Sequence, residues 1–429
     1  MLTVAYLSNR YPSLVEPYVG EEIVELRARG VRVVTGTVHR SLGSSTVTPD
    51  VVVFRLKASV LFSALGLCFR RWKCLASILS RILLEGTEGP VQRLKALVHT
   101  FLGACYAVML EGRDVDHIHV HHGYFGSWIG MTAARLLGVE YSLTLHGSDL
   151  LLHGAYLDSK LESCAFCMTI SEFNRRYILQ KYPLVDPSKI IVARLGVEVL
   201  SQSRSSTVEA KRTEAFTVVA VGRLHAVKNH EFLLSACARL LAMEVPFECL
   251  IAGDGPERRH LESVIGRYGL EGRVTLLGHV RREQMNSLYD RADLVVLTSR
   301  SEGIPLVLME AMARGKLVLA PAITGMPELI VPGKTGFMYE PGSMNSFLEK
   351  VLFIHSMVEA AKIADLRPLE PCALGASRQL KWIRHAARIH VLHNFSREKN
   401  LERFATEFIQ RAGPRFESYS YENPVLQQV

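Results

Sequence analysis

Mostly apolar runs of strand length alternate with helix-forming stretches along much of the chain. Leu2–Leu7, Ala215–Val221 and Ala292–Thr298 are three such runs, and turn residues and then helical patterns follow them. Short apolar runs bounded by turns indicate buried strands. Strands that alternate with helices predict an α/β fold built on parallel sheets.

The length and one polar stretch predict how this α/β chain is divided. A chain of 429 residues is long enough for two or three domains. Ser201–Glu214 is polar and lacks periodicity, which predicts a linker. We therefore expect one domain over residues 1–205 and another over 215–390. A helix break at Asn394–Ser396 then predicts a last helical segment over 395–413 and a disordered tail.

The segment Ser301–Gly315 (SEGIPLVLMEAMARG) holds the most informative candidate residues. It follows a predicted strand, so Glu302 lies in a strand-to-helix turn and Pro305 suits the first helical position. Free amides at such a helix start can bind phosphate, and a carboxylate at Glu310 can accept hydrogen bonds from paired hydroxyls. Two solvated glutamates beside a turn are the alternative. The candidate amide donors are Ile304, Leu306 and Val307.

A second candidate turn follows the predicted strand Ala215–Val221. Gly222 permits a tight turn, and Arg223 and Lys228 can converge on the oxygens of a diphosphate. Two exposed cations beside a helix are the simpler interpretation. The GDGP sequence that ends at Pro256 mainly indicates another turn.

Together these motifs resemble a known enzyme family. GRLHAVKN, IAGDGP, GHV, SEGIPLVLMEAMARG and PELIVPGKTGF occur in the order and spacing of retaining glycosyltransferases of family 4, and the resemblance is strong from about Phe216 to Tyr339. It implies the GT-B fold: two Rossmann-like domains facing a cleft, with a final helix that crosses back to the N-terminal domain. It also implies a nucleotide-diphospho-sugar donor as substrate, with no metal and no cofactor.

The resemblance gives each matching residue an expected role. Arg223, Lys228 and the helix start would stabilise the departing diphosphate, while Glu310 would hold the ribose. His146, in the LTLHGSD turn, and Glu302 would contact the sugar as catalytic residues. Glu172 would lie near the acceptor. The helix-start residues expected at the donor are Gly303, Ile304 and Leu306.

The first loop departs from many family members because it lacks their double glycine. Its residues Pro12, Glu16 and Tyr18 instead resemble a subgroup common among exopolysaccharide and colanic-acid-type transferases. This departure leaves the first-loop contacts open. The subgroup suggests a lipid-linked saccharide acceptor in bacterial polysaccharide biosynthesis.

Histidines and cysteines give little support for a metal site. His117, His119 and His121 share one face of a predicted strand, with His122 next to them. No carboxylate or cysteine stands at ligand spacing, so we expect a packed or cleft-lining strand. Cys164 and Cys167 form a CxxC without a second pair, which argues against zinc.

The net charge of +8 is concentrated in part of the N-terminal half. Cations flank the apolar runs Ala58–Phe69 and Ala96–Leu110, which are too short to span a bilayer. A basic amphipathic helical insert over about 55–111 predicts peripheral contact with an anionic membrane. The alternative is a helical hairpin packed on the N-terminal domain; a nucleic-acid surface is disfavoured because aromatic and polar readers are not interleaved.

These features predict a cytoplasmic enzyme at the inner face of the plasma membrane, since the chain begins directly with a strand and reduced thiols suit that compartment. Two rival functions stay open. One is another GT-B enzyme, either a nucleotide-sugar epimerase or a phosphorylase. The other is a non-catalytic sugar- or partner-binding protein on a transferase scaffold.

Overall fold

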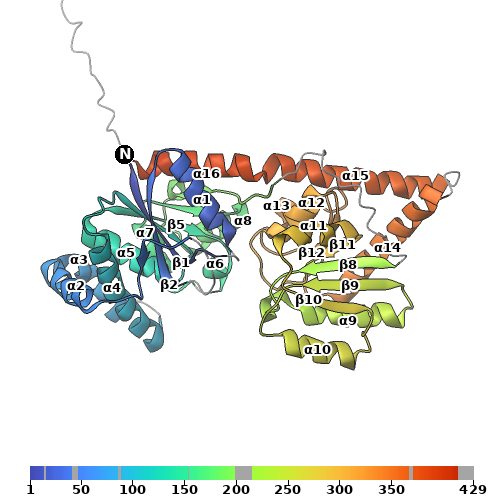
Figure 1. Ribbon diagram of the computed structural model, residues 1–429, viewed down its shortest axis with the longest axis horizontal. Coiled ribbons are helices and arrows are strands. Elements are labelled where there is room, and N and C mark those ends of the chain that lie inside the picture. Colours follow the sequence, from blue (N-terminus) through green and yellow to red (C-terminus); the bar gives the residue numbers. More distant parts are fainter. Residues whose placement is uncertain are drawn as a thin grey trace, which may run out of the picture. The chain divides into compact units, whose positions relative to one another are not determined.

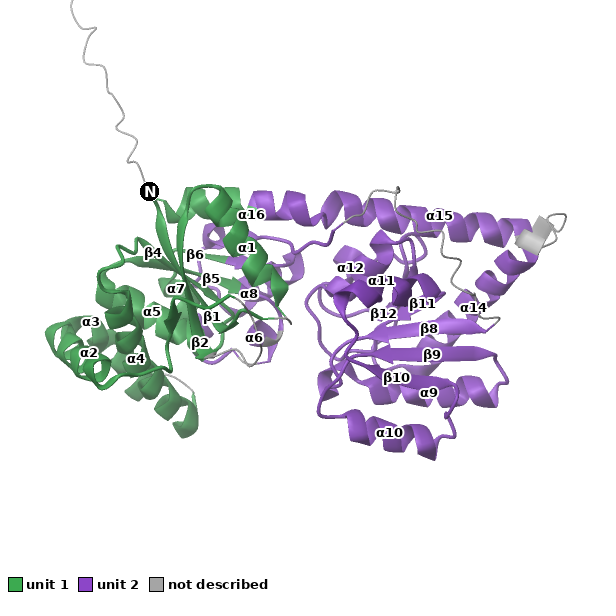
Figure 2. Ribbon diagram, viewed as in Figure 1, with its two compact units in different colours: residues 1–144, 159–167, 404–429 green, residues 145–158, 168–403 purple. Residues whose placement is uncertain are grey.

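A computed structural model describes residues 1–13, 16–40, 47–85, 88–152, 154–198, 215–366 and 371–413 (Figure 1). The chain forms two compact units (Figure 2). The first contains residues 1–144, 159–167 and 404–429, and the second contains residues 145–158 and 168–403. The predicted linker Ser201–Glu214 and the predicted tail after Gly413 lie outside the described residues.

A seven-stranded sheet occupies the N-terminal half in the order β3-β2-β1-β4-β5-β6-β7. β1 pairs in parallel with β2 on one side and with β4 on the other. The strand order therefore reverses between β1 and β4, the point where ligands bind in open α/β sheets. The strands are β1 (Thr3–Tyr11), β2 (Arg32–Arg40), β3 (Val51–Val52), β4 (His117–His121), β5 (Glu140–Leu145), β6 (Phe166–Thr169) and β7 (Ile190–Val192).

Helices connect these strands, and local sequence explains where they stop and start. The α5 helix ends at Gly138, whose φ of 76° is a left-handed conformation that glycine adopts without strain. The α8 helix begins after Ser171, whose hydroxyl accepts a hydrogen bond from the backbone N–H of Asn174. The connecting helices are α1 (Pro17–Ala28), α5 (Phe125–Leu137), α6 (Ser148–Leu151), α7 (Leu157–Ser163) and α8 (Glu172–Lys181).

The predicted basic insert consists of α2 (Ala58–Arg70), α3 (Trp72–Leu83) and α4 (Pro90–Leu110) (Figure 1). The α4 helix has 21 residues, so the expectation that no helix here is long enough to span a bilayer was wrong for α4. Half of the most apolar 18-residue stretch of α4 is buried, however, and α4 packs along α5. At Gly103 a Cβ atom would lie only 2.6 Å from the Thr132 Cβ, so this helix pair needs glycine there. The core helix of a soluble protein can be as long and as apolar as α4.

A six-stranded parallel sheet forms the C-terminal half in the order β10-β9-β8-β11-β12-β13. Its strand order reverses between β8 and β11, which are parallel neighbours. The predicted α/β class with two parallel sheets is thereby confirmed. The strands are β8 (Phe216–Val221), β9 (Phe247–Ala252), β10 (Val274–Gly278), β11 (Leu294–Val296), β12 (Leu317–Pro321) and β13 (Phe337–Tyr339).

Apolar cores lie on both faces of this second sheet, so β8, β9, β11 and β12 are almost fully buried, whereas the edge strand β10 is partly exposed. One core includes Phe216, Leu234 and Leu261, and the other includes Val219, Leu308 and Met312. Burial of each large side chain contributes roughly 1.5–3 kcal/mol before entropy is subtracted. The helices that cover the sheet are α9 (His230–Ala242), α10 (Arg258–Arg267), α11 (Arg282–Arg291), α12 (Leu306–Ala313), α13 (Met326–Leu329), α14 (Met344–Leu366) and α15 (Pro371–Asn394).

The last helix, α16 (Arg397–Ala412), belongs partly to the first unit. The predicted break at Asn394–Ser396 separates it from α15. From Phe404 onward the chain groups with the first unit, where the Phe408 ring lies 5.0 Å from His119 and 5.6 Å from Phe166. The crossing expected of the final helix is therefore present.

Candidate active site

Two loops follow neighbouring strands at the reversal point of the second sheet. β8 ends at Val221 and β11 at Val296, and the two strands pair directly. Their loops are tied together by the Thr298 hydroxyl, which donates to the Lys228 carbonyl at 3.0 Å, and by the Arg300 N–H, which donates to the Val227 carbonyl at 2.8 Å. Both predicted motifs thus meet where the topology favours a ligand.

Lys228 and Glu302 form an ion pair in this region. Their side chains are only 18% and 11% exposed, so each charge is largely removed from water. The Ser299 hydroxyl also donates to the Glu302 carboxylate at 2.6 Å. A partly buried carboxylate needs such partners, because an uncompensated charge there would be costly. Sequence reasoning assigned Lys228 to the phosphate and Glu302 to the sugar, and it did not predict that they pair.

Arg223 lies in the same turn but does not join the ion pair. It is exposed and has no ion-pair partner within the described residues. The turn packs against the GDGP turn so closely that a Cβ on Gly253 would lie 1.9 Å from the Gly222 carbonyl oxygen. Gly253 also has a φ of 143°, so glycine is required there for two reasons. The GDGP sequence therefore supports the Arg223 turn as well as forming its own.

The His146–Gly147 turn lies against Gly303. A Cβ on Gly147 would be 3.3 Å from the Gly303 N, and a Cβ on Gly303 would be 3.1 Å from the His146 carbonyl oxygen. The predicted catalytic residues His146 and Glu302 are thus carried by two backbone segments in contact. His146 itself is half-buried.

Two polar residues that sequence reasoning missed hold this turn in place. The buried carboxylate of Asp149 accepts the His146 N–H at 3.2 Å and the Gly147 N–H at 2.8 Å. The Asn174 side-chain amide donates to the His146 carbonyl at 2.6 Å. The acidic helix start after His146 was visible in the sequence. No local pattern indicated that Asn174, 28 residues away, would reach the same turn.

The start of α12 differs in one detail from the prediction. Pro305 precedes the helix with ψ of 124° and does not occupy its first helical position, so α12 begins at Leu306. Extended backbone at Pro305 lets its carbonyl accept from the Leu308 N–H at 3.2 Å. Ile304 is buried, and Leu306 stands at the helix start. Gly303 and Ile304 therefore precede Pro305 in this turn, and Leu306 follows it at the start of α12.

Glu310 lies on α12 and is held by a residue that the sequence gave no reason to select. The Tyr289 hydroxyl of α11 donates to the Glu310 Oε2 at 2.8 Å. Burial raises the pKa of Glu310, whereas the Tyr289 hydrogen bond and then Arg282 and Arg314 lower it. Glu310 is thus a partly desolvated carboxylate with a fixed donor on one oxygen.

Glu172 stands at the start of α8, and its expected place near the acceptor stays a prediction. Its backbone N–H donates to the Glu328 carboxylate at 3.1 Å, and the N–H of Phe173 donates to the same carboxylate at 2.8 Å. Arg194 also pairs with Glu328, at 3.1 Å. Glu328 therefore caps the start of α8, a location where a carboxylate is favoured. Its position in the PELIVPGKTGF motif was noted, but this role was not.

The β4 histidines are packed within the first unit. His121 Nε2 lies 2.7 Å from the Glu22 carboxylate and 2.8 Å from the Tyr6 hydroxyl. His117 lies 2.7 Å from the Ser142 hydroxyl, and burial lowers its pKa to about 4. The prediction missed Glu22, which comes from α1 rather than from a nearby position in sequence. Cys164 and Cys167, in the same unit, are buried and form no disulfide within the described residues.

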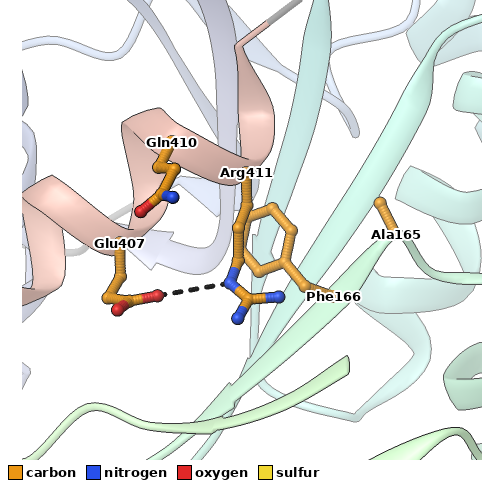
Figure 3. A pocket seen from close by; sticks show the side chains of 5 residues that line it. All are labelled: Ala165, Phe166, Glu407, Gln410 and Arg411. Atoms are coloured by element: carbon orange, nitrogen blue, oxygen red, sulfur yellow. Dashed lines mark hydrogen bonds and ion pairs between the residues drawn. The ribbon is translucent and has the colours of Figure 1, made fainter. Parts of the chain in front are cut away.

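A hollow of about 410 Å³ lies beside α16 in the first unit (Figure 3). It is lined by Ala165 and Phe166 at the start of β6 and by side chains of α16, where Arg411 pairs with Glu407 at 3.3 Å. The start of β6 lies at the amino-terminal ends of the parallel strands, whereas ligands bind at the carboxyl ends in such sheets. The hollow contains none of the predicted site residues.

Comparison with known proteins relates the second unit to a family. Residues 201–363 match the model named Glycosyl transferases group 1. The chain is 35% identical over 159 residues to alpha-D-kanosaminyltransferase of Streptomyces kanamyceticus, a match covering 35% of this chain and 41% of that protein. It is 35% identical over 158 residues to WcaL of Salmonella typhimurium, named as a colanic acid biosynthesis glycosyltransferase, covering 35% and 38%. These matches span about two fifths of each relative.

A solved structure extends the similarity of the fold to nearly the whole chain. Anabaena Alr3699/HepE in complex with UDP superimposes with a TM-score of 0.64 at 18% identity, covering 96% of this chain and all of that one. At this identity the likeness concerns the fold. The chain therefore has the GT-B fold, and its residues 201–363 match the model of the group 1 glycosyltransferases.

Proposed function

We propose that this protein is a retaining glycosyltransferase that moves a sugar from a nucleotide-diphospho-sugar to an acceptor hydroxyl. The main support is the arrangement at the reversal point of the second sheet. Lys228 and Glu302 meet there, and Glu310 follows on α12. These residues lie within the segment that matches the group 1 family model.

The charges of the site suit a departing diphosphate. Lys228 and Arg223 would offset the negative charge that develops on the leaving group, which is electrostatic catalysis. Lys228 is paired with Glu302. In the donor complex we infer that the Lys228 ammonium donates hydrogen bonds to both Glu302 and the phosphate. The ion pair with Glu302 therefore keeps the ammonium in place and paired before the donor binds. Backbone N–H groups at Gly303, Ile304 and Leu306 would add donors.

The remaining residues would position the ribose and the sugar. Glu310 would accept hydrogen bonds from the ribose hydroxyls, and His146 and Glu302 would contact the sugar. Glu302 already has two partners, Lys228 and Ser299, so we assign it an electrostatic role. We favour front-side transfer, in which the leaving phosphate helps to deprotonate the acceptor. The reaction as proposed uses no metal and no cofactor.

A panel of nucleotide-sugars tests the proposed activity. Thermal shift should identify a stabilising donor, and release of the nucleoside diphosphate should accompany slow hydrolysis without acceptor and continue in EDTA. Glu310→Gln should weaken binding of that donor. Stabilisation by no nucleotide-sugar would contradict the proposal, and strict dependence on added magnesium would contradict a metal-free site.

Release of a free epimerised sugar, or phosphate-dependent cleavage, would favour the epimerase or the phosphorylase instead. Binding without turnover would favour a non-catalytic protein.

For the acceptor we propose a lipid-linked saccharide of bacterial polysaccharide biosynthesis at the cytoplasmic face of the membrane. The named role of WcaL supports this pathway class. The insert supports membrane contact. Of the 22 exposed large hydrophobic residues in the described chain, ten lie between residues 58 and 98. Such a concentration of apolar side chains on a protein surface indicates an interaction site.

The corner between α2 and α3 carries this apolar surface beside positive charge. Phe69 is 83% exposed and Trp72 is 60% exposed. Arg70, Arg71 and Lys73 alternate with them, are exposed, and form no ion pair within the described residues. Aromatic side chains and cations together suit the interface of an anionic bilayer. We therefore propose that this corner makes the peripheral membrane contact.

A further inference from the structure

Tyr289 of α11 places a single polar atom beside Glu310. Its side chain is 1% exposed and belongs to the apolar core that includes Leu308 and Met312. The hydroxyl lies 2.8 Å from Glu310 Oε2 and 3.4 Å from the Val307 carbonyl oxygen. A tyrosine ring fixed in a core has little freedom. The position of its hydroxyl is therefore fixed, and the hydroxyl can hold the Glu310 carboxylate in one orientation.

The direction of this hydrogen bond is set by the surroundings. Burial raises the pKa of Tyr289 well above its ordinary value, and the negative charge of Glu310 raises it further. The hydroxyl therefore keeps its proton and donates. Of the groups that lower the pKa of Glu310 against its burial, Tyr289 contributes most, followed by Arg282 and Arg314. Tyr289 thus favours the ionised carboxylate.

We propose that Tyr289 is a positioning residue for the nucleotide, which holds Oε2 of Glu310 so that Oε1 accepts the ribose hydroxyls. This inference rests on the proposed nucleotide-sugar function. Glu310 is half-buried. Within the described part of the chain its Oε2 accepts from Tyr289, and no hydrogen bond reaches its Oε1. An ionised carboxylate accepts about four hydrogen bonds over its two oxygens, so Tyr289 leaves capacity for a paired diol.

Different parts of the proposed site bind the ribose and the phosphates. Without the Tyr289 hydroxyl, the Glu310 carboxylate is free to turn about its last bond, and ribose must fix it at an entropic cost. The phosphate contacts of Lys228 and Arg223 come from the β8 loop and do not involve α11. Loss of the hydroxyl should therefore weaken the ribose contribution alone.

Calorimetry with UDP, GDP and ADP, each compared with its 2′-deoxy form, provides the test. For the nucleotide that wild type binds, Tyr289→Phe should weaken affinity about tenfold, the effect of one hydrogen bond to a charged group. The deoxy form should show a much smaller difference between the two proteins. In a Glu310→Gln background Tyr289→Phe should add less than about twofold, because coupled residues are not additive.

Tyr339→Phe is the matched control, since Tyr339 is also buried in the second unit and its hydroxyl lies 3.3 Å from the backbone carbonyl of Leu297. It should leave nucleotide affinity unchanged, and melting temperatures should show that both variants fold. If wild type binds nucleotide and Glu310→Gln weakens it while Tyr289→Phe does not, the positioning role is overturned and the proposed function stands. If wild type binds none of the three ribonucleotides, the positioning role is overturned, and the nucleotide-sugar panel decides the proposed function separately.

Discussion

At the residue scale, the pairing of Lys228 with Glu302 makes each charge depend on the other. Lys228→Ala would remove the cation expected to stabilise the leaving diphosphate and would leave Glu302 without its ion-pair partner. We expect turnover to fall more than about tenfold, since each tenfold is about 1.4 kcal/mol of barrier. Lys350→Ala is the control, because Lys350 pairs with Glu349 on the surface. Donor hydrolysis by purified variants measures both, and wild-type turnover in Lys228→Ala would contradict the assignment.

Glu310 gives a prediction about pH. Burial raises its pKa, so the carboxylate takes up a proton at a higher pH than an ordinary glutamate does. The ionised form accepts the ribose hydroxyls, and nucleotide affinity should therefore decline as the pH falls from 7 toward 5. Glu310→Gln should lack this part of the pH dependence and retain only the titration of the ligand phosphate. Calorimetry across this range measures the difference, and parallel curves for the two proteins would contradict it.

Sequence reasoning identified the residues of this site that belong to continuous motifs. Arg223, Lys228, Glu302 and Glu310 stand in such motifs, and the structure brings Lys228 and Glu302 together. It did not identify the supporting roles of Asp149 and Glu328, and it missed Asn174 and Tyr289 altogether. These residues act across large separations, as when Tyr289 of α11 reaches Glu310 of α12. Single tyrosines and asparagines occur in many settings, so only the fold reveals which of them reach the site.

At the element scale, strands were easier to predict than helix boundaries. Runs such as Ala215–Val221 became β8 almost unchanged, because a buried parallel strand needs a continuous apolar sequence. Pro305 illustrates the difficulty with helices. It suited the first helical position, yet extended backbone at Pro305 moved the start of α12 to Leu306. The length of α4 was underestimated because its first two turns carry Gln92, Arg93 and Lys95 outside the apolar run.

The corner of α2 and α3 carries a prediction of its own. Wild type should co-sediment with anionic vesicles at low salt, and replacing Arg70, Arg71 and Lys73 with Glu should reduce binding strongly. Each cation near an anionic surface contributes roughly 1 kcal/mol, and salt weakens that attraction. Phe69→Ser with Trp72→Ser should remove the fraction that resists salt. Trp72 fluorescence should shift to the blue on binding.

A matched control for the vesicle experiment comes from the second unit. Arg259, Arg267 and Arg273 are also exposed, and their replacement with Glu changes the net charge equally. Vesicle binding should survive this change, and nucleotide binding should survive the changes at the α2–α3 corner. Wild-type protein that stays in the supernatant at low salt would show that these helices are packing elements alone, and the lipid-linked acceptor would lose its support.

At the scale of the whole molecule, each unit contains a buried histidine that should make folding sensitive to acid. His117 lies in the first unit and His230 in the second, and both are at most 3% exposed. Burial lowers the pKa of each to about 4, from the ordinary histidine value of about 6.5. For His230 the charge of Lys228 lowers the pKa further. Both rings are therefore neutral in the folded protein at neutral pH.

These shifts predict that both units lose stability between pH 7 and pH 4. The unfolded chain takes up a proton on each histidine near pH 6.5, while the folded chain resists protonation until about pH 4. Stability is therefore fully present above pH 7 and declines as the pH falls through this window, by about 2 kcal/mol per histidine at pH 5. Calorimetric unfolding at pH 7.5 and pH 5 should show it. His117→Gln and His230→Gln should each remove part of the pH dependence, the first in the transition of the first unit and the second in that of the other. Equal pH dependence in wild type and both variants would show that other groups cause the acid sensitivity.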